Sequence, residues 1–226
     1  MPLIRRDIVR VTESTVERVR QFPASVLADV AGRRGTMHGR IQPATALTRF
    51  AGSALTVEVR PGDNLMIHAA IAIAQPGDVI VVDGKGDQTA ALMGAIMATA
   101  CKHVGVAAIV LDGCHRDSDE LDAIGLPFFS VGANPNGPTK GLTGRVNWPI
   151  ACGGVAINPG DLIVGDSDGV LVIEPARVEA LLGPAGKKIE EERKRIHQIT
   201  HGGPITPGWL ADSLRSVGAL GKDEAL

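Results

Sequence analysis

Hydrophobic and polar positions change their spacing several times along the chain, and each spacing predicts a type of element. Residues 12–20 and 23–32 have the caps and apolar spacing of short helices. Residues 53–60 alternate like a half-buried strand and end at the turn signal Pro61-Gly62. Asp63 or Asn64 can then cap a short helix that extends to residue 74.

Two continuous β-branched runs, residues 79–82 and 106–111, are typical of strands buried on both faces. An alanine-rich stretch between them predicts a helix over residues 88–102. A short helix over residues 117–124 and a strand over residues 127–131 follow. The order strand, helix, strand, helix, strand implies parallel crossover connections and an α/β core.

Beyond Gly132 the sequence is rich in Asn, Pro and Gly, which predicts a loop over residues 133–141. Short strands are expected at residues 155–157, 162–164 and 170–173. A helix over residues 175–198 is expected in two pieces, broken near Gly183-Pro184, before a last short helix within residues 209–220. We therefore expect one α/β domain over residues 1–182 and a helical tail over residues 183–226, packed on the core or on a neighbouring subunit.

Composition narrows the classes of ligand. Only 3% of the 226 residues are aromatic, which argues against a stacking platform for single-stranded nucleic acid. The formal net charge is −2, so no cationic excess favours a phosphate backbone. The longest apolar runs are too short to cross a bilayer, and the start of the chain does not resemble a leader. We expect a cytoplasmic protein that binds neither nucleic acid nor membrane.

Ligands of open α/β sheets collect at the carboxyl ends of the parallel strands, where this chain is acidic. The two segments are Asp83-Gly-Lys-Gly-Asp87 and Asp112-Gly-Cys-His-Arg-Asp117, and we expect them to meet over one crevice. If the intervening helix begins near Gly94, its free backbone N–H groups can hold an anion.

Arg116 and Asp117 are adjacent within the second of these segments. A guanidinium can grip a carboxylate at two points, and an aspartate suits Mg²⁺, which needs only one or two protein carboxylates and keeps several waters. The alternative is that the two residues form a helix cap and a surface ion pair. The residue types alone leave both interpretations open.

Other chemistries have weaker support. His115 and Asp117 together could ligate zinc, but the six histidines are scattered without zinc-like spacing. The three cysteines, Cys101, Cys114 and Cys152, lack a Cys-x-x-Cys spacing and are typical of small buried residues. The glycine turn after Asp83 suggests a methyltransferase or dehydrogenase, but it lacks the third glycine of the dinucleotide fingerprint and has acids on both sides.

A series of motifs, taken together, resembles one family. It joins the regulator of ribonuclease E activity A to the class II aldolases that act on 4-hydroxy-4-methyl-2-oxoglutarate and 4-carboxy-4-hydroxy-2-oxoadipate. The resemblance covers about residues 24–181. The motifs are Val81–Asp87, Gly94, Val106–Asp117, Gly137–Lys140, Val146–Pro149, Cys152–Val155, Pro159–Asp161 and Asp166–Val170.

The resemblance implies a swivelling-type β/β/α domain with a mixed sheet, N-terminal helices and a C-terminal helical extension. It also implies homotrimers or hexamers with sites at subunit boundaries. By the same resemblance, Arg116 grips the carboxylate of a pyruvyl group and Asp117 holds Mg²⁺ or Mn²⁺. Backbone amides of Gly94, Ala95, Ile96 and Met97 match the loop that contacts the acid group of the substrate.

The chain departs from the aldolase pattern at one position. An acidic residue precedes the Arg-Asp pair by 20 intervening residues in the aldolases and handles a proton at the pyruvate methyl group, and here that position is Ala95. Glu120 keeps an acid where some catalytic members have one. A glutamate on the neighbouring subunit's C-terminal helix, Glu191 or Glu192 by a loose alignment, is expected to support the metal-bound water. His115 flanks the pair, and our hypothesis is that it replaces the missing acid–base group or shifts specificity.

The expected function is a metal-dependent lyase on short α-keto acids, either an aldolase that releases pyruvate or an oxaloacetate decarboxylase. Both reactions leave an enolate, which a divalent ion and a fixed guanidinium stabilise. No Schiff-base lysine is then needed. Two alternatives stay open: a non-catalytic regulator that binds a ribonuclease or another protein, and a methyltransferase.

Overall fold

The computed structural model describes residues 1–226, which form two compact units, Met1–Ala185 and Gly186–Leu226. The helices are α1 (Glu13–Arg20), α2 (Ala24–Val30), α3 (Leu65–Ile71), α4 (Ala95–Val104), α5 (Ser118–Ile124), α6 (Pro175–Thr200) and α7 (Leu210–Ser216). The strands are β1 (Gln42–Pro43), β2 (Phe50–Glu58), β3 (Asp78–Met93), β4 (Ala108–His115), β5 (Phe128–Ala133), β6 (Arg145–Val146), β7 (Ile150–Cys152), β8 (Val155–Ile157), β9 (Leu162–Asp166) and β10 (Gly169–Ile173). No helix combines the length and the apolar character that a bilayer span requires.

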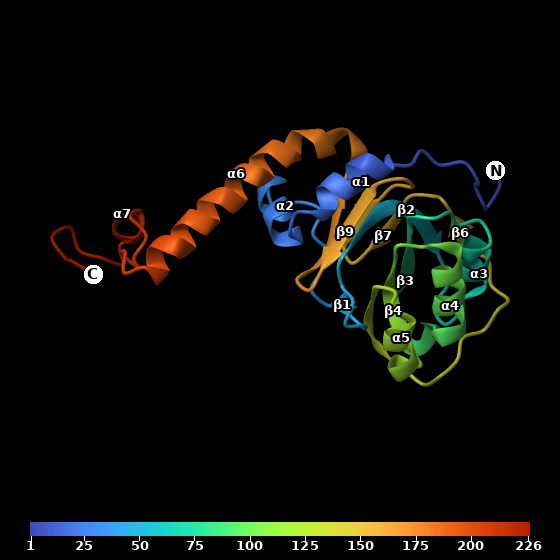
Figure 1. Cartoon of the computed structure of the whole chain (residues 1–226). Coiled ribbons are helices and arrows are strands. Elements are labelled where there is room, and N and C mark those ends of the chain that lie inside the picture. The colour runs from blue at the N-terminus through green and yellow to red at the C-terminus, as the bar shows by residue number, and fades with distance from the viewer. The chain divides into compact units, whose positions relative to one another are not determined.

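One mixed sheet organises the first unit. Its strand order is β1-β5-β4-β3-β2-β9-β10, with β6 paired to β2, and β7 and β8 form a separate hairpin. The neighbours β2, β3, β4 and β5 are parallel, whereas β1, β6, β9 and β10 join antiparallel. Helices α3, α4 and α5 are the crossovers between the parallel strands (Figure 1). The predicted α/β class, with a mixed sheet, N-terminal helices and a C-terminal helix, is confirmed.

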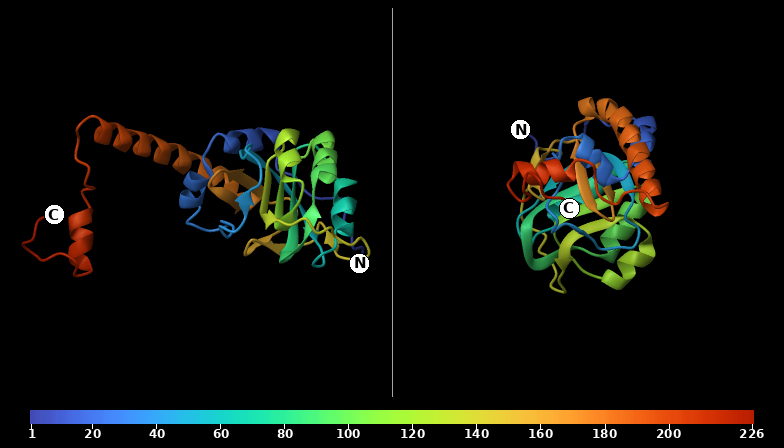
Figure 2. Two further views of the ribbon diagram at one scale, coloured as in Figure 1. Left: turned by 90° about the horizontal axis from the view of Figure 1, so that it is seen from below. Right: turned by 90° about the vertical axis from the view of Figure 1, so that its left-hand side faces the viewer.

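The apolar runs fill a separate core on each face of this sheet. Ile80 and Val82 of β3 belong to the cluster beneath α3, α4 and α5, whereas Val79 and Val81 belong to the opposite cluster, with residues of β7 and β8. This split follows from the alternation of side chains along a strand. The left view of Figure 2 shows the three crossover helices side by side on the same side of the strands. The strands are therefore buried on both faces, as their composition predicts.

The prediction of a helix from residue 88 was wrong. Strand β3 continues to Met93, and α4 begins only at Ala95. Tertiary pairing overrides the helical preference of the alanines here, because β3 pairs with β4 as far as Met93 and the Ala91 N–H donates to the carbonyl of Asn136 at 2.8 Å.

Two further differences concern short-range signals. The predicted break of the last long helix was wrong, since α6 is continuous through Gly183 and Pro184. Proline removes one backbone donor, and the turns on either side of it keep their own hydrogen bonds. The short strands β1, β6 and β7 were not predicted, because two or three residues are too few to show an alternation.

Candidate functional site

A pocket of about 150 Å³ lies where β3 ends, β4 ends and α4 begins. Its wall combines apolar side chains with one carboxylate and two side chains that are cationic at neutral pH. The lining residues are Asn64, His68, Ala91, Leu92, Met93, Gly94, Ile96, Met97, Arg116, Asp117, Pro138 and Lys140.

Asp117 caps helix α4 from a distant part of the chain. Its backbone lies in the left-handed region, with φ 60° and ψ 44°, a conformation that aspartate tolerates better than most residues. One carboxylate oxygen, Oδ2, accepts a hydrogen bond from the Ala95 N–H at 2.9 Å. The carboxylate thus lies at the positive end of the helix dipole, which stabilises its charge.

Gly94 makes this approach possible. Its backbone is extended, a conformation that any residue can adopt, so glycine is needed here for lack of space and not for its backbone conformation. A Cβ at this position would lie 2.3 Å from Oδ2 of Asp117 and 3.0 Å from Cγ of Arg116. Any larger side chain would push the carboxylate away from α4.

Arg116 lies beside Asp117, with Nε 3.8 Å from Oδ2, and the side chains of the two residues are 44% and 36% exposed. The Arg116 N–H donates to the carbonyl of Met93 at 3.0 Å, which fixes the turn against the end of β3. Both interpretations of the sequence are therefore partly correct. The pair forms a cap and a long ion pair, and both side chains also reach a pocket.

Lys140 lines the pocket, although the sequence reasoning considered it only as part of a motif and as a Schiff-base lysine. The loop that presents it is tied to Asp63, whose Oδ2 accepts hydrogen bonds from the Thr139 hydroxyl and from the N–H groups of Gly141 and Leu142. Although burial opposes ionisation, these bonds and one from the Leu65 N–H lower the pKa of Asp63 to about 2. The Gly137–Lys140 motif is the sequence signal that could have pointed to Lys140.

Asn64 was missed, because a helix cap is the simpler explanation of an asparagine at that position. Its side-chain N–H groups donate to the Leu92 carbonyl at 2.9 Å and to the Met97 sulfur at 3.3 Å. The other polar atom, Oδ1, is buried without a partner. Asn64 therefore ties α3 to the end of β3 and to α4 at the pocket wall.

His115 does not line the pocket. It is buried at the end of β4, where its ring nitrogens meet the hydroxyls of Ser130 at 2.8 Å and Ser118 at 3.0 Å. Burial lowers the pKa of His115, so the neutral ring is favoured near pH 7. The geometry thus separates His115 from the space into which Arg116 and Asp117 point.

The structure brings together only some of the expected site residues. Gly94, Ile96 and Met97 line the pocket with Arg116 and Asp117, while the Ala95 amide is occupied by Asp117. Glu120 is exposed on α5 and is not part of the wall. Glu191 and Glu192 lie on α6 in the second unit, where Glu192 pairs with Lys188 at 3.2 Å.

The donor set at the pocket fits a hard divalent ion held mainly by water. No cluster of three or more His, Cys, Asp or Glu side chains exists, and Asp117 is the one carboxylate of the lining. Its Oδ2 accepts the hydrogen bond from the Ala95 N–H, so Oδ1 is the carboxylate oxygen that this bond does not use. Mg²⁺ accepts one protein carboxylate and keeps several waters, so Asp117 suffices for such a site, whereas a zinc site would need more ligands.

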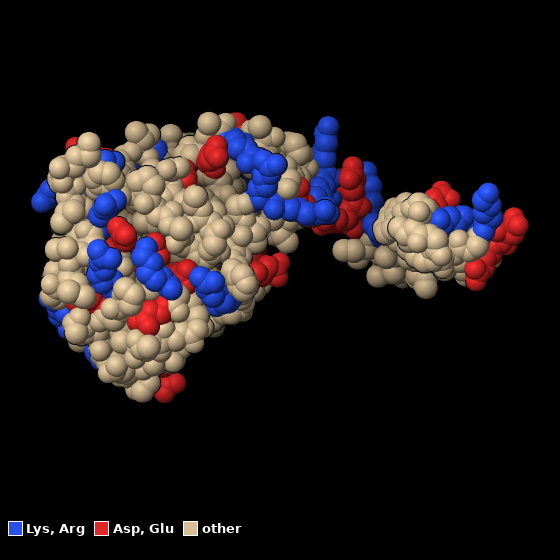
Figure 3. Space-filling view, turned by 180° about the vertical axis from the view of Figure 1, so that it is seen from behind, with Lys and Arg blue, Asp and Glu red and all other residues tan.

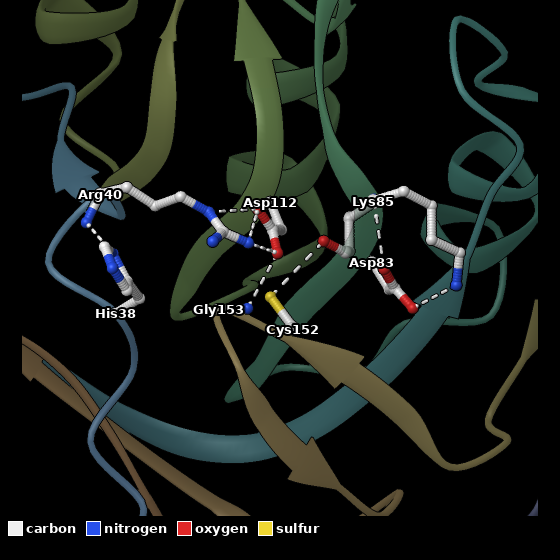
Figure 4. A network of polar contacts seen from close by, with 8 residues as sticks. His38, Arg40, Asp83, Lys85, Asp112, Cys152 and Gly153 are labelled. Carbon is white, nitrogen blue, oxygen red and sulfur yellow. Dashed lines mark hydrogen bonds and ion pairs between the residues drawn. The ribbon is translucent and has the colours of Figure 1, made fainter.

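The expected crevice between Asp83 and Asp112 is filled. Both carboxylates are buried, and Asp112 accepts hydrogen bonds from the Arg40 guanidinium and from the Gly153 N–H at 2.9 Å (Figure 4). Asp83 accepts from the Lys85 ammonium at 2.6 Å. For Asp83 and Asp112 the expected crevice is absent, because the turn of the β7–β8 hairpin and Arg40 occupy the space beside Asp112. The second of the two segments reaches a pocket through Arg116 and Asp117 instead.

The three cysteines are all free and buried. The Cys152 thiol, labelled in Figure 4, contacts the Val82 carbonyl at 3.6 Å, and burial raises the pKa of this thiol. Burial also raises the pKa of Cys101 to about 12 and raises that of Cys114.

On the face drawn in Figure 3, basic and acidic side chains of the first unit are intermixed.

Comparison with known proteins places this geometry in context. A family model described as "RraA-like: Aldolase/RraA" matches residues 15–172. A protein of Halalkalibacterium halodurans named "Putative 4-hydroxy-4-methyl-2-oxoglutarate aldolase" is 38% identical over 185 residues, which cover 82% of this chain and 88% of that protein.

Solved structures show the same fold. An uncharacterized protein from Pseudomonas syringae superposes with a TM-score of 0.76 at 25% identity and covers 87% of this chain and 97% of that one. The RNA-processing inhibitor RraA from Thermus thermophilis gives a TM-score of 0.62 at 27% identity, over 66% of this chain and 91% of its own.

Proposed function

The chain belongs to the RraA-like family, and from that membership we propose that it is a divalent-metal-dependent lyase acting on short α-keto acids. The single observation that supports this best is the convergence of Arg116, Asp117 and the first turn of α4 on one pocket. The pocket offers a carboxylate for a metal ion beside groups that bind an anion.

An α-keto acid is an anion at neutral pH, and the pocket is suited to that charge. The Arg116 guanidinium can bind a carboxylate at two points, and the Lys140 ammonium adds a second positive charge. The N–H groups of Ile96 and Met97 lie in the first turn of α4, where backbone donors lack a helical acceptor.

We propose that Asp117 holds the divalent ion, Mg²⁺ or Mn²⁺, through Oδ1 or a bound water. When bound, the ion supplies a Lewis acid for the oxygen on which negative charge develops. The protein's part is to keep the carboxylate in place, which it does through the Ala95 N–H and the fixed turn before α5.

Arg116 then stabilises the enolate that forms when the carbon–carbon bond breaks. Its charge is placed before the reaction, so no reorganisation is needed as the enolate develops. Removal of one such preorganised donor commonly lowers the rate by about 10²- to 10³-fold.

Ala95 makes decarboxylation the better-supported reaction. Both reactions leave an enolate that must take up a proton to become pyruvate, and retro-aldol cleavage also requires removal of a proton from the substrate hydroxyl. Ala95 supplies no acid or base for either transfer, so retro-aldol cleavage lacks one more proton-transfer group than decarboxylation does. Loss of CO₂ from a β-keto acid such as oxaloacetate breaks the bond without prior removal of a proton. We propose oxaloacetate as the first substrate to test and 4-hydroxy-4-methyl-2-oxoglutarate as the second.

The test is turnover of a panel of oxoacids with Mg²⁺ or Mn²⁺. We expect metal-dependent release of pyruvate from at least one of them, and a loss of at least about 100-fold in Asp117→Ala. Asp119→Ala, an exposed acid on the adjoining helix, is the matched control and keeps wild-type activity. Turnover that needs no metal, or that survives Asp117→Ala, contradicts the proposal.

A second candidate is a non-catalytic regulator of another protein. Two observations favour it: Ala95 stands at the acidic position of the aldolases, and one solved structure with this fold is titled an RNA-processing inhibitor. Metal-dependent turnover of any oxoacid decides for the lyase. Its absence, with inhibition of a purified ribonuclease, decides for the regulator.

We also propose that the protein is a cytoplasmic homo-oligomer, a trimer or a hexamer. In such an assembly Glu191 or Glu192 of a neighbouring copy would reach the metal-bound water, and Glu120 would add an acid at the rim. Both glutamates on α6 are exposed, and Glu192 also pairs with Lys188 on the same helix.

A further inference from the structure

The residue before the Arg-Asp pair, His115, has no role in the proposed chemistry, yet it is tightly held. It is the last residue of β4 and pairs in register with Met93 of β3 and with Ala133 of β5. Only 6% of its surface is exposed, and its ring lies 5.7 Å from that of Phe128. A buried polar ring is unfavourable unless its nitrogens are satisfied.

Both nitrogens are satisfied, each by a different element. Nδ1 is 2.8 Å from the hydroxyl of Ser130 on β5, and Nε2 is 3.0 Å from the hydroxyl of Ser118, the first residue of α5. The bond to Ser118 closes a ring that contains only two intervening residues. Those two residues are Arg116 and Asp117.

The turn closed in this way carries backbone strain. Asp117 lies in the left-handed region, which costs a non-glycine residue of order 1 kcal/mol or more, so the surroundings must hold it there. The Arg116 N–H bonds to the Met93 carbonyl on one side of the turn, and the Asp117 carbonyl accepts from Glu120 and Leu121 on the other. The contact between His115 and Ser118 is the side-chain bond that spans the turn.

We propose that His115 is a positioning residue that clips this turn. Through Ser118 it keeps Asp117 in the left-handed conformation, so that Oδ2 reaches the Ala95 N–H and the second oxygen is presented to the metal. Ser130 anchors the other edge of the ring to β5. The inference rests on the proposed metal-binding role of Asp117, and it replaces the hypothesis that His115 transfers protons.

Three variants separate the clip from the rest of the ring. Ser118→Ala removes only the bond across the turn. His115→Gln places an amide near the former position of Nε2 and can still reach Ser118, whereas His115→Asn places one near the position of Nδ1 and can reach only Ser130. Ser130→Ala is the matched control, because it removes a hydroxyl of the same kind from the opposite edge of the ring.

Two measurements read the effect without turnover. One is the affinity for Mn²⁺ by titration, and the other is the hydrogen-exchange protection of the Ala95 amide. We expect Ser118→Ala and His115→Asn to bind Mn²⁺ about tenfold more weakly, the lower range found when a partner of a metal ligand is removed. The Ala95 amide should exchange faster in the same two variants. His115→Gln should stay close to wild type in both measurements, and Ser130→Ala should change less than Ser118→Ala.

Excess Mn²⁺ provides a third reading. A positioning residue affects the fraction of sites that hold the metal ion. Saturating metal should therefore restore most of the rate of Ser118→Ala and His115→Asn. Unchanged Mn²⁺ affinity in Ser118→Ala with unchanged protection of the Ala95 amide overturns the inference. A variant of His115 that binds Mn²⁺ normally but loses its rate at saturating metal overturns it as well, in favour of proton transfer.

Failure of the proposed function would look different. If the wild-type protein binds no Mn²⁺ and turns over no oxoacid, the lyase proposal fails. The Ala95 amide still reports on the clip in that case, because its hydrogen bond to Asp117 is formed by the protein alone. Faster exchange in Ser118→Ala supports the clip, and wild-type exchange refutes it.

Discussion

At the scale of single residues, the position of the Asp117 carboxylate depends on Gly94, which has no side chain. Gly94 is required for the space it leaves, since its backbone is extended and open to any residue. The sequence indicated that a helix can begin near Gly94, but it did not predict that the carboxylate of Asp117, 22 residues beyond Ala95, fills the space beside this glycine.

Gly94→Ala should therefore weaken metal binding by roughly tenfold or more, because the new Cβ displaces Asp117 Oδ2 from the Ala95 N–H. Titration with Mn²⁺ measures the change. Gly183→Ala is the control, since a Cβ there meets nothing within 4 Å. Equal affinity in the two variants would show that the carboxylate does not need its contact with α4.

Asp63 links acid stability to the loop that carries Lys140. Its pKa in the folded protein is lowered to about 2, below its usual value of 3.8, so the folded state favours the ionised carboxylate. The resulting stability is present above about pH 4 and is lost as the pH falls toward 2. The shift corresponds to about 2 kcal/mol.

Asp63→Asn tests this link. The variant should be less stable than wild type at pH 7 by about 2 kcal/mol, and the difference should shrink as the pH falls from 4 to 2. Urea unfolding at several pH values measures both curves. A difference that is constant with pH would show that the Asp63 charge does not stabilise the loop.

At the scale of elements, the long apolar runs were the dependable signals. Residues 79–82 and 106–111 lie in β3 and β4 as expected, because burial on both faces leaves little choice of composition. The end of β3 was not predictable from its residues, since residues 84–93 are held by pairing with β4 and by the Asn136 carbonyl. Local preference indicates which elements form, and tertiary pairing determines where they end.

The candidate site divides in the same way. Arg116 and Asp117 were found because they follow a strand in a recognisable pattern. Lys140 and Asn64 reach the pocket through loops and helix starts whose paths depend on contacts with Asp63 and Met97. His115 was expected at the site because it precedes the pair in the chain, whereas its ring lies outside the pocket lining and contacts Ser130.

The segment before α1 is attached to the start of β3 by a buried ion pair. Arg10 donates to both carboxylate oxygens of Asp78 at 2.7 and 2.9 Å, and the Asp78 side chain is fully buried. Arg10→Met should lower the free energy of unfolding by about 3 kcal/mol, because it leaves an unpaired buried charge.

An exposed pair of equal geometry gives the control. Arg18 bonds to both oxygens of Glu179 at 2.8 and 3.0 Å with both side chains more than half exposed, and Arg18→Met should cost less than about 1 kcal/mol. Denaturant unfolding of the two variants measures the contrast. Equal losses would mean that burial of Asp78 does not set the strength of its pair.

At the scale of the whole molecule, the second unit exposes apolar side chains that a solitary chain would leave in water. Trp209 is 65% exposed, and Ile205 and Val217 are exposed still further. Large exposed apolar groups commonly mark contacts with another protein. We expect these residues to be covered when copies of the chain assemble.

Fluorescence can report this assembly, because the chain has only two tryptophans. In Trp148→Phe the emission comes from Trp209 alone, and we expect it to shift to longer wavelength on dilution as the copies separate. Analytical ultracentrifugation of the same samples gives the mass. An oligomer whose emission does not change on dissociation would place Trp209 outside the interface.

Because all three native thiols are buried, we expect them to react little with labels directed at a cysteine introduced on the surface. Maleimides and thiol-reactive spin labels react with exposed thiolates. A buried cysteine whose pKa is raised therefore reacts slowly with these reagents. A single cysteine introduced on the surface would then carry the whole label without prior removal of the native ones. Probes could thus be attached at a chosen site in an otherwise unaltered chain.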